Sequence, residues 1–234
     1  MKKLIRYCSY VLLLAGASIW ICIGCFRPGT FFKTPNLGHR LGGDIIEEFP
    51  ENTLDAFRIA MQQHESKEGY LYSECDLRET ADHQIALFHD WDLARLVPDT
   101  QENRDALSVK QIDDSILFKD FTLQQLQQLK LQGGARIPTL DQFLACAAEL
   151  HPEKLILLEI KLFHSDAARA RVIQQAQAFR ETTGAEIHFL AFIRNLKRSH
   201  PAPRQWLDEF QAAGFRVYQV YRPKTPENDL CETW

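Results

Sequence analysis

Cysteine is too sparse and too scattered to define a structural framework in this chain. Three of the six cysteines lie in or beside an apolar run near the N-terminus, and the others are Cys75, Cys146 and Cys231. No pair has the spacing of zinc ligands, and an odd number outside the run indicates no disulfide pattern. The sequence therefore gives no support to a zinc-binding or disulfide-stapled fold, and it also lacks internal repeats and low-complexity tracts.

Basic residues are scarce in the body of the chain. Lys2, Lys3 and Arg6 are the charged residues of positions 1–26, which leaves 24 of the 27 basic residues against all 31 acidic ones in the remainder. A mildly acidic body argues against nucleic acid as a partner. The composition, with 45% hydrophobic and 25% charged residues, is that of a globular protein.

The twenty residues Tyr7–Phe26 carry no charge and follow a cationic leader. At about 1.5 Å per residue, a helix of this length spans the roughly 30 Å hydrocarbon core of a bilayer. We predict an uncleaved, hydrophobic signal anchor within residues 1–33, with lipid attachment at Cys25 and signal-peptide cleavage after Ala17 as alternatives. Each of these places residues 34–234 on the extracytoplasmic side, membrane-anchored or exported, with the membrane contacted through the N-terminal segment.

Residues 34–234 are predicted to form one α/β domain. Runs rich in strand-forming residues occur at six places: Asn36–Arg40, Tyr70–Leu77, Gln84–His89, Leu155–Leu162, Glu186–Ile193 and Phe215–Tyr221. Helical patterns separate several of these runs, and this alternation indicates parallel pairing of the strands. The fourth run, LILLEIKL, is almost wholly apolar, as expected for a strand that is covered on both faces.

Four polar residues precede the predicted helices at positions that favour helix N-caps: Asn52, Thr122, Thr139 and Ser165. Both threonines are followed three residues later by glutamine, which is the capping-box pattern. Residues 91–134 fit the alternation less well, because this polar stretch is much longer than an ordinary connection. We interpret it as a cap-like insertion that covers the mouth of the site.

Charged residues occupy predicted buried strands, where an unpaired charge is costly. Alternation places Glu74 and Asp76 on one face of the second predicted strand, and Glu159 and Lys161 on one face of the fourth. Neighbouring carboxylates repel each other unless a positive charge lies between them. Three carboxylates without cysteine or histidine at usable spacing suit Ca²⁺ or Mg²⁺ better than Zn²⁺, so we predict a divalent-cation site.

Basic side chains and histidines lie at the ends of the first and third predicted strands. His39 and Arg40 end the first, and His89 ends the third. In parallel α/β folds, sites form at the C-terminal ends of the strands. Arg40 and Lys161 offer positive charge to a phosphate, and the two histidines can act as general base and general acid. Each residue alone also fits a simple ion pair or a structural histidine, but their coincidence favours a phosphodiester-cleaving site.

Six short motifs in order resemble the glycerophosphodiester phosphodiesterase family of phospholipase-C-like barrels. They are GHR at 38–40, PENTLDAF at 50–57, ECDL at 74–77, FHD at 88–90, IPTLDQF at 137–143 and LEIK at 158–161. Together they extend over about residues 37–165, and six motifs in order are far more specific than any one alone. The resemblance implies a TIM-type (β/α)8 barrel that hydrolyses glycerophosphodiesters to glycerol 3-phosphate and an alcohol.

The resemblance also implies a role for each candidate residue. It implies metal ligands at Glu74, Asp76 and Glu159, catalytic histidines at His39 and His89, and phosphate-binding residues at Arg40 and Lys161. The family mechanism implies that a neighbouring glycerol hydroxyl attacks phosphorus, while one histidine takes its proton and the other protonates the leaving alcohol. The substrate is then a small glycerophosphodiester or a lysolipid, and the cofactor is Ca²⁺ or Mg²⁺.

Two departures from the family pattern leave alternatives open. Leu41 interrupts the usual His-Arg-Gly and affects the loop that holds Arg40. Six predicted strands fall short of eight, so either the C-terminal part closes the barrel irregularly or the barrel is shortened and incompletely closed there. The alternatives in function are a catalytically degenerate barrel used for binding and a related phospholipase-type lyase that releases a cyclic phosphate.

Overall fold

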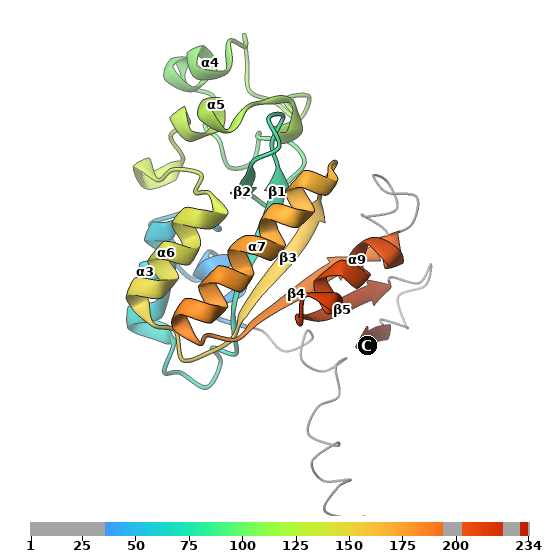
Figure 1. Ribbon diagram of the computed structural model, residues 1–234. Helices are drawn as coiled ribbons and strands as arrows, with labels where there is room; N and C mark the ends of the chain where they lie inside the picture. Colours follow the sequence, from blue (N-terminus) through green and yellow to red (C-terminus); the bar gives the residue numbers. More distant parts are fainter. Residues whose placement is uncertain (1–35, 194–202, 222–229, 234) are drawn as a thin grey trace, which may run out of the picture. The chain divides into compact units, whose positions relative to one another are not determined.

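The computed structural model of the protein describes residues 36–193, 203–221 and 230–233. The anchor predicted within residues 1–33 lies outside these ranges. Within them, no helix is both long enough and apolar enough to cross a bilayer. The described residues form one sheet with helices against it, which confirms the predicted α/β class (Figure 1).

Six strands of the described chain form a single sheet in the order β2-β1-β3-β4-β5-β6. The four central strands pair in parallel: β1 (Ser73–Glu79), β3 (Ile156–Leu162), β4 (Ile187–Phe192) and β5 (Arg216–Tyr221). Antiparallel strands lie at the two edges: β2 (Ile85–Leu87) and β6 (Leu230–Thr233). The prediction of parallel pairing is wrong for β2, because the turn at 80–84 is far shorter than the roughly dozen residues that a parallel crossover needs.

The main hydrophobic core lies between one face of the sheet and the helices. These helices are α3 (Leu54–His64), α6 (Leu140–Leu150), α7 (Asp166–Thr183) and α9 (Pro203–Ala212) (Figure 1). A row of side chains from neighbouring strands packs against them: Cys75, Leu158, Phe189 and Val217. Because side chains alternate along a strand, the positions between these residues point away from the helices, and they include Glu74, Asp76 and Glu159.

Side-chain caps explain where most of the helices begin. Thr139 caps α6 and Ser165 caps α7, while Thr122 caps the short helix α5 (Leu123–Gln128). Both threonines form complete capping boxes, so these three predictions are confirmed. The prediction for Asn52 is wrong, because Thr53 caps α3 while Asn52 adopts a left-handed φ of 58° and uses its side chain elsewhere.

The first predicted strand, Asn36–Arg40, is not a strand. The chain forms a turn and then a short 3-10 helix, His39–Gly42. The side chain of Asn36 takes the place of a backbone partner, since its nitrogen donates to the carbonyl of Tyr72 at 2.9 Å and its oxygen accepts from the same residue's amide at 3.4 Å. Gly38 permits this close approach, because a Cβ there would lie 2.1 Å from the Tyr72 carbonyl oxygen.

Residues 91–134 surround a second hydrophobic core. They contain α4 (Gln101–Leu107), α5 and the 3-10 turns Phe118–Asp120 and Gln132–Gly134. Phe118 stacks on Phe88, which follows β2, with 5.0 Å between the ring centroids. The segment lies beyond the end of the sheet where β1 and β3 finish (Figure 1). Its function as a cover for the site stays a prediction.

The sheet of the described residues is open, and the closed eight-stranded form that the resemblance implies is not seen in them. Its edge strands β2 and β6 each pair with one strand. Five of the six predicted strands are observed, while Leu230–Thr233 was not predicted because four residues give too weak a sequence signal. The expectation of a barrel shortened or incompletely closed at its C-terminal end agrees with this arrangement.

Candidate active site

Three carboxylates meet on the face of the sheet opposite the helices. Glu74 and Asp76 come from β1, and Glu159 comes from β3. The register pairs Asp76 directly with Glu159, so their side chains leave the sheet on the same side. One carboxylate oxygen of each residue lies within 4.8 Å of the other two, and all three side chains are buried. The structure thus brings together the three residues predicted from the sequence as metal ligands.

The donor set of this cluster fits a hard divalent cation. Buried oxygens of all three residues, Glu74 Oε1, Asp76 Oδ1 and Glu159 Oε1, make no hydrogen bond within the described chain. Asp76 Oδ1 and Glu159 Oε1 face the ammonium group of Lys161, whereas Glu74 Oε1 has no such neighbour, and leaving a buried polar atom without a partner costs about 1–3 kcal/mol. Burial, strengthened by repulsion from Asp76 and Glu159, raises the pKa of Glu74 well above its ordinary value, and burial raises the pKa of Glu159 to about 7. A cation bound by these oxygens would remove both costs.

Lys161 supplies one positive charge to the same cluster. Its Nζ lies 3.0 Å from Asp76 Oδ1 and 2.5 Å from Glu159 Oε1, close enough for ion pairs although not aligned as hydrogen bonds. Burial lowers the pKa of Lys161, but attraction to these two carboxylates outweighs it and the net shift is upward. Burial raises the pKa of Asp76, but attraction to Lys161 and His89 together with the hydrogen bond from Asn52 outweighs it, so the net shift is downward. Lys161 supplies one positive charge against three carboxylates, so a bound cation would balance the negative charge that remains.

Two residues that precede α3 in the chain, both in left-handed backbone conformations, hold the carboxylates in place. Arg40, with φ 48°, donates its backbone N–H to Glu74 Oε2 at 2.8 Å, and its Nε lies 3.8 Å from Asp76 Oδ2. Asn52 donates from Nδ2 to Asp76 Oδ2 at 2.7 Å and accepts from the Asp76 backbone at 3.0 Å. Such backbone strain is tolerated where the surroundings fix it, and Leu41, also left-handed and fully buried, anchors this turn.

Each predicted catalytic histidine is bonded to an aspartate. His39 Nδ1 lies 2.5 Å from Asp44 Oδ2, and its Nε2 lies 3.8 Å from Glu74 Oε2. His89 Nδ1 lies 2.6 Å from Asp90 Oδ1. Because an ionised carboxylate only accepts hydrogen bonds, Nδ1 is the donor in both pairs and Nε2 is left for other partners.

Arg78 fixes the backbone at His89. It lies on β1 two residues after Asp76 and is buried. Its Nε and Nη2 donate to the carbonyl of His89 at 3.2 and 2.6 Å, and its guanidinium lies 4.9 Å from the ring centroid of Trp91. Burial lowers the pKa of Arg78 to about 10, a value at which it stays charged at neutral pH.

Five further residues that were not predicted from the sequence support the site: Asp44, Asp90, Arg78, Arg95 and Glu51. Glu51 accepts from Arg40 Nη1 at 3.0 and 3.1 Å and from two nitrogens of Arg95. The position of Asp90 directly after His89 is a signal in the sequence for this pair, since histidine orientation commonly depends on a carboxylate. Asp44 lies five residues after His39 and Arg95 five after Asp90, in loops without a regular period, and the contact of Glu51 with Arg95 spans 44 residues.

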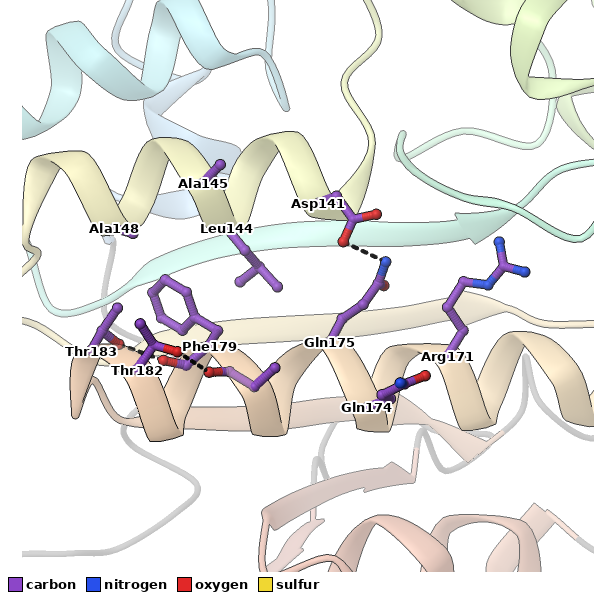
Figure 2. A pocket seen from close by; sticks show the side chains of 11 residues that line it. Asp141, Leu144, Ala145, Ala148, Arg171, Gln174, Gln175, Phe179, Thr182 and Thr183 are labelled. Atoms are coloured by element: carbon purple, nitrogen blue, oxygen red, sulfur yellow. Dashed lines mark hydrogen bonds between the residues drawn. The ribbon is translucent and has the colours of Figure 1, made fainter.

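A groove on the helical side of the sheet is not part of this site. It lies between α6 and α7 and has a volume of about 550 Å³. Figure 2 shows Gln175 donating to Asp141 across it, with a distance of 2.6 Å between Nε2 and Oδ1. Asp141 and Arg171 are its charged lining residues, and the rest of the lining is aliphatic, aromatic, amide or hydroxyl. The groove therefore offers no acid–base pair comparable to the histidine–aspartate pairs.

The fold and the site define an α/β protein with a buried carboxylate cluster beside two histidine–aspartate pairs and several cationic side chains. Residues 45–189 match the glycerophosphoryl diester phosphodiesterase family. This is well over half of the chain, so the chain belongs to that family, as its motifs indicated. Comparison with curated proteins finds no match.

Several solved structures of glycerophosphodiester phosphodiesterases are similar to this chain, and the one from Silicibacter pomeroyi shares its fold. The chain superimposes on the protein from Silicibacter pomeroyi with a TM-score of 0.54 and 20% identity, covering 81% of this chain and 65% of that one. For the protein from Agrobacterium tumefaciens, the TM-score is 0.47 and the identity 22%, covering 72% and 60% respectively. The phosphodiesterase of Oleispira antarctica was solved with the product sn-glycerol-3-phosphate. Its TM-score is 0.47 and its identity 20%, covering 78% of this chain and 73% of that one. This chain thus spans less than two thirds of the first two proteins.

Proposed function

We propose that this chain hydrolyses glycerophosphodiesters to glycerol 3-phosphate and an alcohol. The observation that carries the proposal is the convergence of three buried carboxylates against one lysine, beside histidines whose Nδ1 atoms are held by aspartates. Membership of the family supports the same reaction. A Ca²⁺ or Mg²⁺ ion bound by Glu74, Asp76 and Glu159 would act as Lewis acid and template for the phosphate.

The side chains around the cluster then have separate tasks. Arg40 and Lys161 neutralise the phosphate oxygens, because both cations border the carboxylates and both remain charged at neutral pH. Asn52 and the backbone of Arg40 each occupy one oxygen of a ligand, which directs the other oxygen inward. The segment 91–134 lies beyond the strand ends and would limit the access of water and bulky substrates.

The two histidines move the protons. A glycerol hydroxyl next to the phosphate attacks phosphorus, so that a new P–O bond forms while the P–O bond to the alcohol breaks. One histidine takes the hydroxyl proton at Nε2, and the other donates a proton to the departing oxygen. Water then opens the cyclic phosphate with the roles reversed, which restores both histidines. Asp44 and Asp90 hold the imidazoles in the tautomer that this requires.

The proposed activity predicts a metal-dependent release of product. Purified protein supplied with Ca²⁺ or Mg²⁺ should release glycerol 3-phosphate from glycerophosphocholine or glycerophosphoethanolamine, and an excess of EDTA should abolish the release until the metal is restored. Phosphorus NMR of the products separates the alternatives. Accumulation of a cyclic phosphate would identify a lyase, while failure to turn over any glycerophosphodiester or lysolipid would leave a binding protein.

We also propose an extracytoplasmic location for residues 34–234, based on the uncharged run Tyr7–Phe26 behind a cationic leader. The full chain carrying a C-terminal tag should fractionate with membranes or in the exported fraction, and protease added outside intact cells or spheroplasts should remove the tag. A tag that stays protected, in the cytosolic fraction, would contradict this location.

A further inference from the structure

The site contains a chain of charged side chains that reaches from one histidine to the carboxylate cluster. It begins at His89 Nδ1, 2.6 Å from Asp90 Oδ1. Asp90 Oδ2 then accepts from Arg95 Nε at 2.5 Å. Arg95 forms a fork with Glu51, with Nη1 2.9 Å from Oε2 and Nη2 2.6 Å from Oε1. Glu51 also holds Arg40, whose Nε lies 3.8 Å from Asp76 Oδ2.

Arg95 is the element on which this chain depends. Its guanidinium uses all three nitrogens on two carboxylates, and the planar fork fixes the direction of each. The hydrogen bonds from His89 and Arg95 outweigh burial and lower the pKa of Asp90, so this carboxylate stays ionised. Hydrogen bonds to Glu51 and Asp90 raise the pKa of Arg95. A lysine, with its point charge, cannot serve both carboxylates in this geometry.

Two segments that are far apart in the sequence meet at this arginine. Residues 89–95 follow β2, and residues 40–51 precede α3. Each carries one candidate for the reaction, His89 in the first and Arg40 in the second. Glu51 is 7% exposed, so its two arginine partners supply charge that its burial requires. The distance between His89 and Arg40 is therefore set by the carboxylate of Glu51 and the two hydrogen bonds that it accepts from Arg95.

We propose that Arg95 is a positioning residue, which orients the imidazole of His89 through Asp90 and sets its distance from Arg40 through Glu51. This inference rests on the proposed function for its kinetic consequences, but the orientation of His89 is a property of the protein alone. Arg95 is not required to touch the substrate. Its loss should lower kcat by about 10- to 100-fold, as is typical for residues that orient a functional side chain, with little change in KM.

The experiment compares Arg95→Met and Arg95→Lys with Arg104→Met. Arg104 lies on α4 in the same segment, and its Nη1 pairs with Asp99 Oδ1 at 3.0 Å, outside the chain from His89 to Asp76. We expect Arg95→Met to lose kcat at near-wild-type KM, with a lower melting temperature because buried Glu51 loses one of its two arginine partners. Arg95→Lys should recover only part of the lost kcat, and Arg104→Met should match the wild type. Asp90→Asn combined with Arg95→Met should cost less than the product of the two single losses, because both act through His89.

A second measurement keeps the test independent of catalysis. Nitrogen-15 NMR of the histidine side chains should show His89 protonated at Nδ1 in the wild type and in Arg104→Met, and a tautomer mixture in Arg95→Met. An unchanged kcat together with an unchanged His89 tautomer would overturn the proposal, as would an equal loss in Arg104→Met. If no glycerophosphodiester is turned over, the proposed function fails, and the tautomer measurement alone decides the role of Arg95.

Discussion

Replacing Asp76 with asparagine is expected to lower kcat/KM by about 10³-fold, the largest loss from any single side chain of the cluster. Asp76 accepts from Asn52, lies 3.0 Å from Lys161 Nζ and is paired in register with Glu159. An amide of the same shape carries no charge, so it cannot bind a divalent ion comparably, and its NH₂ group faces either the Asn52 donor or the lysine. Losses of 10²–10³ are typical when one electrostatic contact of a reacting centre is removed.

The same substitution should be visible without any substrate. For the wild type, Ca²⁺ at about 100 times its dissociation constant adds about 2.7 kcal/mol to the free energy of unfolding. For a chain of this size that corresponds to a rise in melting temperature of about 5–10 °C. Asp76→Asn should lose most of this rise, while Asp114→Asn, at an exposed position in the segment 91–134, should retain it. A wild type that does not respond to Ca²⁺ or Mg²⁺ would refute the cation site.

Removal of either histidine is the second large effect that we expect. His39→Ala and His89→Ala should each lower kcat by about 10²–10⁴-fold, the usual contribution of a positioned acid or base. The double substitution should cost much less than the product of the single losses, because proton removal and proton delivery belong to one reaction. Stabilisation by the metal ion should persist in both variants, since neither histidine is one of the three proposed metal ligands.

His151→Asn is the matched control for these variants. His151 is exposed and ends α6 in a left-handed conformation that asparagine also adopts, so the substitution changes a histidine without disturbing the backbone. Its kcat should equal that of the wild type. A rate in His39→Ala or His89→Ala within about threefold of wild type would remove that histidine from the proton-transfer scheme, whose usual contribution is at least about 10²-fold.

The sequence was most informative where a strand carries charge that it must bury. Alternation in ECDL and LEIK places the two acids of β1 on one face and Glu159 beside Lys161, and the structure shows these side chains in one cluster. The same reasoning was weaker at Asn36–Arg40, where the residues favour a strand and the chain forms a turn instead. There the side chain of Asn36 forms the hydrogen bonds with the Tyr72 backbone that a neighbouring strand would otherwise form, and propensity scales do not include such contacts.

Asn52 shows how a local rule gives way to a tertiary contact. Its position before α3 suits a helix cap, but the neighbouring Thr53 caps the helix and leaves Asn52 to bond Asp76, 24 residues later. The energy of a cap is about 1 kcal/mol, and either residue can supply it. Satisfying a buried carboxylate is worth more, because an unmet bond to a charged group costs more than a lost cap.

The sequence by itself determined the α/β class, three of the helix starts and the identity of the charged residues that share a strand face. These follow from periods of two and of 3.6 residues and from bonds that span three or four positions, so they are local in the chain. Tertiary structure alone decided the open edge of the described sheet and the chain from His89 through Arg95 and Glu51 to Arg40. These depend on which distant segments approach each other, and the free energy of that approach comes from packing and charge satisfaction rather than from any local pattern.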